Sequence, residues 1–171
     1  MTAAKMTAPL KRVTLLAAGA AAFCVLASVP ARAMEFKPYG RGSFEELRKE
    51  RAGRPLVVHF WSATCAPCLA ELPEWSKITR EAKSFDVVFV STDRDADRAR
   101  AAMRLEKAAL AQATHYGFAD AFAERLYFEA DKTWRGELPF TALVGADGGL
   151  VTVIGAVDDP LIASWLEKSG K

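Results

Sequence analysis

Apolar residues in this chain gather in short runs that alternate with charged, amphipathic stretches. Residues 56–61 and 86–91 are nearly continuous runs of apolar and β-branched side chains, which predict strands buried on both faces. The stretches around these runs have the spacing and capping residues of helices. We expect helices over residues 43–51, from residue 69 to about residue 83, and over residues 94–113.

The last third of the chain predicts a hairpin followed by a helix. The turn sequence Asp147-Gly148-Gly149 separates two further apolar runs, which is typical of a β-hairpin. Strands that alternate with helices and end in a hairpin predict an α/β domain with a mixed sheet. The remaining expected elements are a short strand over residues 114–118, a short helix over 119–128, hairpin strands over 141–144 and 150–155, and a helix over 161–168.

Residues 1–33 have the pattern of a secretory leader. Three basic residues (Lys5, Lys11 and Arg12) precede an apolar run, and the segment ends in Ala31-Arg32-Ala33. A positive start, an apolar run and an A-x-A ending predict a signal peptide that is cleaved after Ala33. An uncleaved membrane anchor is the alternative, because the run approaches the length that spans a bilayer. Residues 34–171 then form one exported domain.

Charge and composition change this picture in one respect. The 171 residues carry 23 basic and 21 acidic side chains, but the leader holds four of the basic residues and no acid, which leaves 19 basic against 21 acidic in the domain. This balance gives no electrostatic reason to expect nucleic-acid binding. Half of the residues are hydrophobic (51%), which excludes a largely disordered chain.

A pair of cysteines lies between a predicted strand and a predicted helix, in the sequence Cys65-Ala66-Pro67-Cys68. This places Cys65 at the positive end of the helix, where unpaired N–H groups favour a thiolate over a thiol. Cys68 is one turn later and can attack a mixed disulfide formed at Cys65. Pro67 suits the first helical turn, where its missing N–H is not needed. The spacing therefore predicts a redox-active pair.

Other interpretations of the cysteines remain open. A purely structural disulfide over so short a loop stabilises little through chain entropy. Zinc has few ligands to use, because the domain has no third cysteine and only two histidines, His59 and His115. A chaperone that holds a soft ion such as Cu(I) between Cys65 and Cys68 is a third possibility, with His59 as the one additional candidate ligand.

Two motifs carry a resemblance to a known family. The stretch Trp61-Ser62-Ala63-Thr64-Cys65-Ala66-Pro67-Cys68, followed by Glu71-Leu72-Pro73, resembles the exported thiol–disulfide oxidoreductases of the TlpA/ResA type. Leu138-Pro139 and the residues that follow resemble the family's second signature, a cis-proline loop that faces the cysteines. The resemblance covers residues 40–168 and implies a thioredoxin-like fold, a central mixed β-sheet flanked by helices.

The resemblance also implies roles for individual residues. Cys65 would be the attacking thiolate and Cys68 the resolving thiol, with Glu71 close enough to accept a proton from a buried thiol. A cis-proline makes a tight bend that presents backbone groups to an extended peptide. The residues implied to line the substrate groove are Trp61, Pro67, Leu138 and Pro139.

The sequence departs from the family pattern at two positions. Thr64 stands where the family most often has tryptophan, which removes an apolar lid before Cys65. His59 stands six residues before Cys65, where thioredoxin has a buried acid and this branch commonly a neutral polar residue. An imidazole at this position can shuttle a proton to or from Cys68, and a hydrogen-bonded core histidine is the alternative.

The resemblance implies a periplasmic reductase of protein disulfides, of the kind that serves apocytochrome c or copper-site maturation. Its partners would be protein disulfide substrates and a membrane thiol electron donor, with membrane contact only through an uncleaved N-terminal segment. We expect no nucleic-acid partner, no metal, and no cofactor beyond the redox-active Cys65–Cys68 disulfide. The same site can also donate disulfides, because direction depends on the reduction potential.

Overall fold

The computed structural model describes residues 1–2 and 34–170 of the chain. The predicted leader falls on residues 3–33 and therefore lies outside the described residues, so its cleavage or anchoring stays a prediction. Among the described residues, no helix combines the length and the apolar character that crossing a membrane requires.

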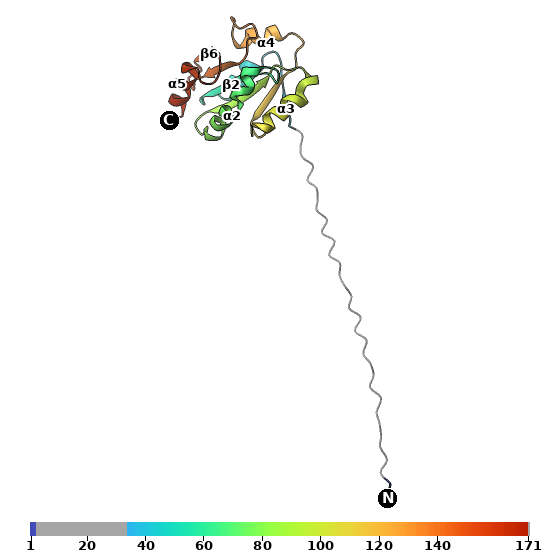
Figure 1. The fold of residues 1–171 in the computed structure, drawn as a ribbon. Helices are drawn as coiled ribbons and strands as arrows, with labels where there is room; N and C mark the ends of the chain where they lie inside the picture. The colour runs from blue at the N-terminus through green and yellow to red at the C-terminus, as the bar shows by residue number, and fades with distance from the viewer. Residues whose placement is uncertain (3–33, 171) are drawn as a thin grey trace. The chain divides into compact units, whose positions relative to one another are not determined.

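The domain, drawn as a ribbon in Figure 1, is built on a mixed sheet. The sheet has six strands in the order β1-β4-β3-β2-β5-β6. The central strand β2 pairs in parallel with β3 and antiparallel with β5, and β6 returns antiparallel to β5. The predicted hairpin is therefore confirmed as β5 and β6. The strands are β1 (Lys37–Tyr39), β2 (Leu56–Trp61), β3 (Asp86–Ser91), β4 (Thr114–Phe118), β5 (Phe140–Val144) and β6 (Leu150–Ile154).

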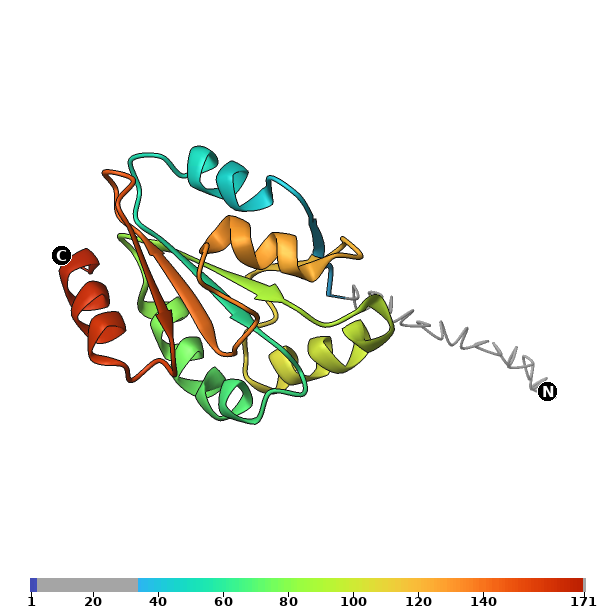
Figure 2. The same ribbon diagram turned by 90° about the horizontal axis from the view of Figure 1, so that it is seen from above.

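Helices cover both faces of the sheet (Figure 2). One core forms between the sheet, α1 and α4, and includes Phe60, Leu126 and Trp134. The second core forms between the sheet, α2, α3 and α5, and includes Trp61 and Trp75. The helices are α1 (Ser43–Glu50), α2 (Ala66–Glu81), α3 (Arg98–Lys107), α4 (Ala123–Ala130) and α5 (Pro160–Ser169), with a single 3₁₀ turn η1 (Asp95–Asp97) before α3.

The alternation of side chains in β2 decides which core each residue enters. Val58 and Phe60 point into the first core, whereas Val57 and Trp61 point into the second. All six residues of β2 are buried, as its continuous apolar pattern predicts. His59 belongs to the second face, so its imidazole is directed towards α2, the helix that carries the cysteines.

The parallel strands β2, β3 and β4 all end at the same edge of the sheet. In sheets of this kind, the loops beyond the carboxyl ends of the strands carry ligands and reactive groups. The cysteine motif follows β2 at this edge, and Asp93 follows β3. The amino end of the antiparallel strand β5 brings Pro139 to the same edge.

Four features of the fold have no counterpart in the sequence pattern. The short strand β1 was not predicted. His115 is 3% exposed and lies against the rings of Phe36 and Phe89, at 5.8 and 5.7 Å between centroids. Met103 is 61% exposed, since α3 buries the face that carries Ala101 and Leu105. Gly42 precedes α1 in a left-handed conformation, and Ser43 is the first residue of the helix.

Candidate active site

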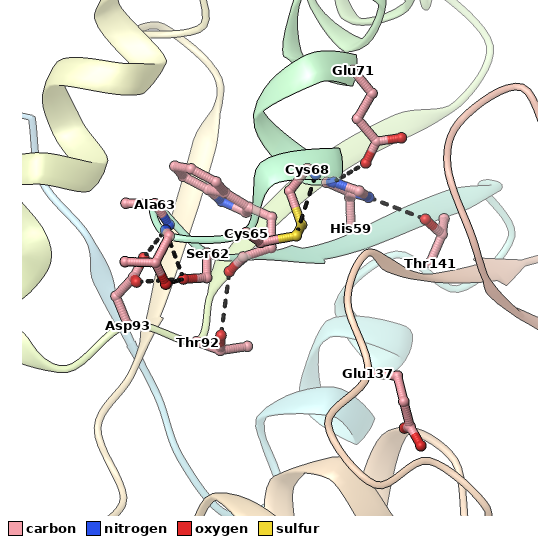
Figure 3. The surroundings of a disulfide bond; sticks show 12 residues. His59, Ser62, Ala63, Cys65, Cys68, Glu71, Thr92, Asp93, Glu137 and Thr141 are labelled. Atoms are coloured by element: carbon pink, nitrogen blue, oxygen red, sulfur yellow. Dashed lines mark hydrogen bonds and ion pairs between the residues drawn. A yellow bond between two sulfur atoms is a disulfide. The ribbon is translucent and has the colours of Figure 1, made fainter.

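Cys65 and Cys68 form a disulfide at the start of α2 (Figure 3). Cys65 is the N-cap residue and is half-buried, whereas Cys68 has no exposed surface. The backbone N–H of Cys68 lies 3.2 Å from Cys65 Sγ and donates to it. The two sulfur atoms therefore differ in accessibility, and an incoming thiol or disulfide reaches Cys65 first.

The position of Cys65 also favours its ionised form. The first N–H groups of a helix have no partner within the helix, and their dipoles stabilise a negative charge at the N-cap. The first turn of α2 contains no acidic residue that would oppose this, and Pro67 occupies a position where no N–H is needed. A thiolate at Cys65 is stabilised by this environment, and a thiolate is the nucleophile in disulfide exchange.

A buried carboxylate holds the loop that precedes Cys65. Asp93 is 7% exposed and accepts hydrogen bonds from Ser62 Oγ at 2.7 Å, from the Ala63 N–H at 2.9 Å and from Ser91 Oγ at 2.8 Å. Ser62 Oγ in turn accepts the N–H of Thr64 at 3.1 Å. Residues 62–64 are thus fixed to the end of β3, on one side of the disulfide in Figure 3.

A second polar group lies on the other side of the disulfide. His59 Nε2 is 3.2 Å from Glu71 Oε1, and His59 Nδ1 is 3.0 Å from Thr141 Oγ1. The other carboxylate oxygen, Glu71 Oε2, accepts the N–H of Val157 at 2.5 Å. Both side chains of the pair are shielded from water, with 0% of His59 and 4% of Glu71 exposed.

Aromatic rings enclose this polar group. The imidazole of His59 lies 4.6 Å from the Trp75 ring and 5.9 Å from the Phe89 ring, measured between centroids. Trp61, which we expected in the substrate groove, has no exposed surface and packs beneath the site instead. These rings exclude water from the His59–Glu71 pair, so interactions between the two side chains are strong.

The loop before β5 carries the predicted cis-proline. The Leu138–Pro139 peptide is cis, Pro139 is buried and Leu138 is half-buried between the two cores. The carbonyl of Pro139 accepts the N–H of Gly155 at 3.0 Å. The loop is thereby tied to the segment between β6 and α5, the same segment whose Val157 binds Glu71.

Trp134 gives this loop its internal support. Its ring stacks on Phe140 with a centroid distance of 3.9 Å, and its Nε1 donates to the carbonyl of Glu137 at 2.8 Å. Hydrogen bonds from its own backbone and from the Arg135 N–H hold the pKa of Glu137 below its ordinary value. Trp134 is therefore part of the packing of the cis-proline loop rather than of the exposed surface.

The structure brings most of the predicted site residues together. Cys65, Cys68, Glu71 and His59 lie around the start of α2, and Leu138-Pro139 is carried by the loop before β5. Sequence reasoning missed two members of the site. They are Asp93, which is recognisable as an acid directly after a buried strand, and Thr141, whose place beside His59 depends on the pairing of β2 with β5.

Possible metal ligands are few in this region. Among residues 34–170, no group of three or more histidine, cysteine, aspartate or glutamate side chains is close enough together to hold a metal ion.

Comparisons with known proteins address the whole domain. A family model described as Redoxin matches residues 35–161. No curated protein matches the sequence significantly.

Solved structures resemble the domain at low sequence identity. A secreted Mycobacterium tuberculosis disulfide oxidoreductase, described as homologous to E. coli DsbE, matches with a TM-score of 0.54 and 21% identity over 70% of this chain and 85% of its own. The thioredoxin domain of a Bacteroides vulgatus thiol-disulfide oxidoreductase matches with a TM-score of 0.55 and 22% identity, over 71% of this chain and 83% of its own. A Chlorobium tepidum thiol:disulfide interchange protein matches with a TM-score of 0.55 and 15% identity, over 72% of this chain and 85% of its own. At these identities the similarity shows a shared fold.

Proposed function

The chain belongs to the Redoxin family and is a thiol–disulfide oxidoreductase with a thioredoxin-like fold, and we propose that it reduces disulfides in partner proteins outside the cytoplasm. The observation that carries this proposal is the asymmetry of the cysteine pair. Cys65 is accessible at the helix N-terminus, whereas Cys68 is fully buried behind it. A nucleophile and a protected resolving thiol are the two groups that a dithiol reductase requires.

The reaction follows from these positions. In the reduced protein, the Cys65 thiolate attacks one sulfur of a partner disulfide, which forms a Cys65–partner mixed disulfide and releases one partner thiolate. Cys68 then loses its proton and attacks Cys65 Sγ, which forms the Cys65–Cys68 bond and releases the second partner thiolate. The partner has gained two electrons, and a dithiol donor must supply two electrons to reduce Cys65–Cys68 again.

Glu71 and His59 are the groups that we assign to the proton of Cys68. Glu71 is one helical turn after Cys68, on the same face of α2, and its carboxylate is held by Val157 and His59. His59 approaches from β2 and bonds Thr141 on its other side. A carboxylate next to an imidazole can accept the proton of the buried thiol and share it across the pair.

The partner polypeptide is proposed to bind beside Pro139. The cis bend at Leu138–Pro139 presents backbone groups with which an extended segment can pair, and Leu138 packs against the same core cluster as Cys65. Thr64, Ala66 and Pro67 are exposed around Cys65 and form the opposite rim. The absence of a large side chain at Thr64 leaves room for a bulky residue next to the partner's cysteine.

Compartment and partners belong to the same proposal. The leader pattern of residues 1–33 supports export, and one structure with this fold is described as secreted. We propose that the domain works in the periplasm, that a membrane thiol carrier reduces it, and that its substrates are oxidised cysteines of apocytochrome c or of copper-site proteins.

Trapping of a mixed disulfide tests the proposed function. In a Cys24→Ser background, Cys68→Ser removes the resolving thiol, so oxidised insulin should remain covalently attached to Cys65 on a non-reducing gel. The matched variant Cys65→Ser should trap nothing and should lose insulin reduction with dithiothreitol as donor. Trapping at Cys68 instead of Cys65 would refute the assigned order, and tight Cu(I) binding without insulin reduction would favour the chaperone.

A further inference from the structure

Among the residues that the structure describes, the buried acids are Glu71 and Asp93, and the proposed reaction does not use Asp93. It lies two residues beyond β3, at the edge of the sheet where β2 also ends, and it is 7% exposed. All three of its side-chain partners are donors: Ser62 Oγ, the Ala63 N–H and Ser91 Oγ. This arrangement suits a carboxylate, which can only accept hydrogen bonds.

No cation neutralises this carboxylate locally. In the part of the chain that the structure describes, Asp93 makes no ion pair. Arg94 and Asp95, the charged residues that follow it, are both exposed. The negative charge of Asp93 therefore lies inside the protein next to the loop that leads to Cys65.

This loop transmits the position of Asp93 to the nucleophile. Asp93 binds Ser62 and Ala63, Ser62 Oγ accepts the N–H of Thr64, and the carbonyl of Ser62 accepts the N–H of Cys65 at 3.1 Å. Thr92 binds the carbonyl of Trp61 at 2.9 Å through its N–H. Each residue from Trp61 to Cys65 is thus held from β3 or from within the loop.

We propose that Asp93 is a positioning residue for Cys65 that also sets its ionisation: it fixes residues 62–64, and its charge opposes formation of the Cys65 thiolate. The proposal rests on the proposed function only in assigning Cys65 as the nucleophile. A negative charge near the thiolate offsets part of the stabilisation that the helix N-terminus provides. By this argument, Asp93 keeps the dithiol from becoming too stable and so favours transfer of electrons to a partner.

Other ionisable groups around Cys65 are in different positions. Glu71 and His59 lie on the far side of Cys68, and Glu137 is an exposed residue of the cis-proline loop (Figure 3). The loop before α5 contributes Asp158 and Asp159. The first turn of α2 has no acid. Asp93 is the acid bound directly to the loop that carries Cys65.

The variant Asp93→Asn separates charge from geometry. An amide keeps one oxygen to accept from Ala63 and Ser91, and Ser62 Oγ can turn its proton to Thr64 Oγ1, which lies 2.9 Å away. Ala63 N is 2.9 Å from the carboxylate and Cys65 is two residues further, so the charge is within roughly 14 Å of the sulfur. Removing it should lower the apparent pKa of the Cys65 thiol by about 0.2–0.9 pH units.

The experiment measures the rate of Cys65 alkylation by iodoacetamide against pH. The full chain carries Cys24→Ser and Cys68→Ser so that Cys65 is the only thiol, with and without Asp93→Asn. The matched control is Asp95→Asn, because the Asp95 side chain is 91% exposed and is two residues away in sequence. We expect the midpoint to move to lower pH in Asp93→Asn and to stay unchanged in Asp95→Asn.

Three results would overturn the inference. They are an unchanged midpoint in a folded Asp93→Asn protein, a shift to higher pH, and an equal shift in Asp95→Asn. Asp93→Ala, which also loses the loop contacts, should slow insulin reduction more than Asp93→Asn does, and equal rates would refute the positioning role. The alkylation assay needs no partner protein, so its outcome is independent of whether mixed-disulfide trapping succeeds at Cys65.

Discussion

The His59–Glu71 pair provides a prediction whose size follows from the structure. The substitution His59→Leu removes the imidazole that lies 3.2 Å from Glu71 Oε1 and 3.0 Å from Thr141 Oγ1. The carboxylate keeps the N–H of Val157 but loses its other polar neighbour in a site that is closed to water. Leaving a buried polar group without its partner costs about 1–3 kcal/mol, so His59→Leu should lower the free energy of unfolding by at least about 1 kcal/mol.

A double-mutant cycle isolates the interaction itself. Glu71→Leu also destabilises the protein, but the double variant His59→Leu/Glu71→Leu should cost less than the two single losses added together. The difference should be about 1–3 kcal/mol in urea unfolding of the oxidised protein, because the contact between the two side chains can be lost only once. Ser62→Ala combined with Glu71→Leu is the control, since Ser62 belongs to the Asp93 group and shares no partner with Glu71.

Additivity would refute this reasoning. If the His59 and Glu71 losses add to within about 0.5 kcal/mol, as the control pair should, the two side chains do not interact in solution. Glu71 would then take up the proton of Cys68 without His59, and the imidazole would be a core histidine bonded only to Thr141.

Three further predictions concern stability and pH. Gly136→Ala should lower the free energy of unfolding by about 2–4 kcal/mol, because Gly136 has φ +102 and an added Cβ would be 2.7 Å from the Tyr127 ring. Gly53→Ala should lower it by only about 1–2 kcal/mol, because Gly53 has φ +84 but lies in open space. Equal losses in urea unfolding would contradict this. Burial lowers the pKa of His115 below 6.5, so the unfolded chain takes up a proton at a higher pH than the folded protein does. The free energy of unfolding should therefore fall as the pH drops below 6.5, and His115→Leu should reduce this dependence on pH. Parallel curves of stability against pH for the two proteins would refute the prediction. Hydrogen bonds from Thr133 and Thr152 lower the pKa of Asp131 below 3.8. The contribution of Asp131 to stability is therefore present above pH 3.8 and disappears as the pH falls through the lowered pKa. Thr152→Val should move the pKa of Asp131 back towards 3.8 in an NMR titration, and an unchanged pKa would contradict the assignment.

Much of the fold was predictable because its pattern is local. The buried runs that became β2 and β3, and the turn residues of the hairpin, identify their elements without knowledge of the rest of the chain. The strand β1 has only three residues, two of them exposed, so it has no hydrophobic pattern to detect. His115 is buried against the rings of Phe36 and Phe89, and its contact with Phe89 follows from the pairing of β4 with β3, which no sequence signal near His115 indicates.

The site was predictable to the extent that it lies in one stretch of sequence. Cys65, Cys68 and Glu71 share one helix, and their spacing alone places them together. Asp93 and Thr141 join the site from β3 and β5, through the parallel register of one strand and the antiparallel register of the other. Such contacts depend on strand order, which a single sequence does not specify residue by residue.

Direction of electron flow is the central claim, and the reduction potential of the Cys65–Cys68 pair tests it most directly. The full chain would be equilibrated in defined thiol–disulfide buffers. The fraction of the protein with an oxidised Cys65–Cys68 pair would then be measured by thiol alkylation and mass spectrometry. We predict a reduction potential near that of thioredoxin, about −270 mV. A value near that of a strong oxidant, about −120 mV, would contradict the reductase assignment and make the protein a disulfide donor.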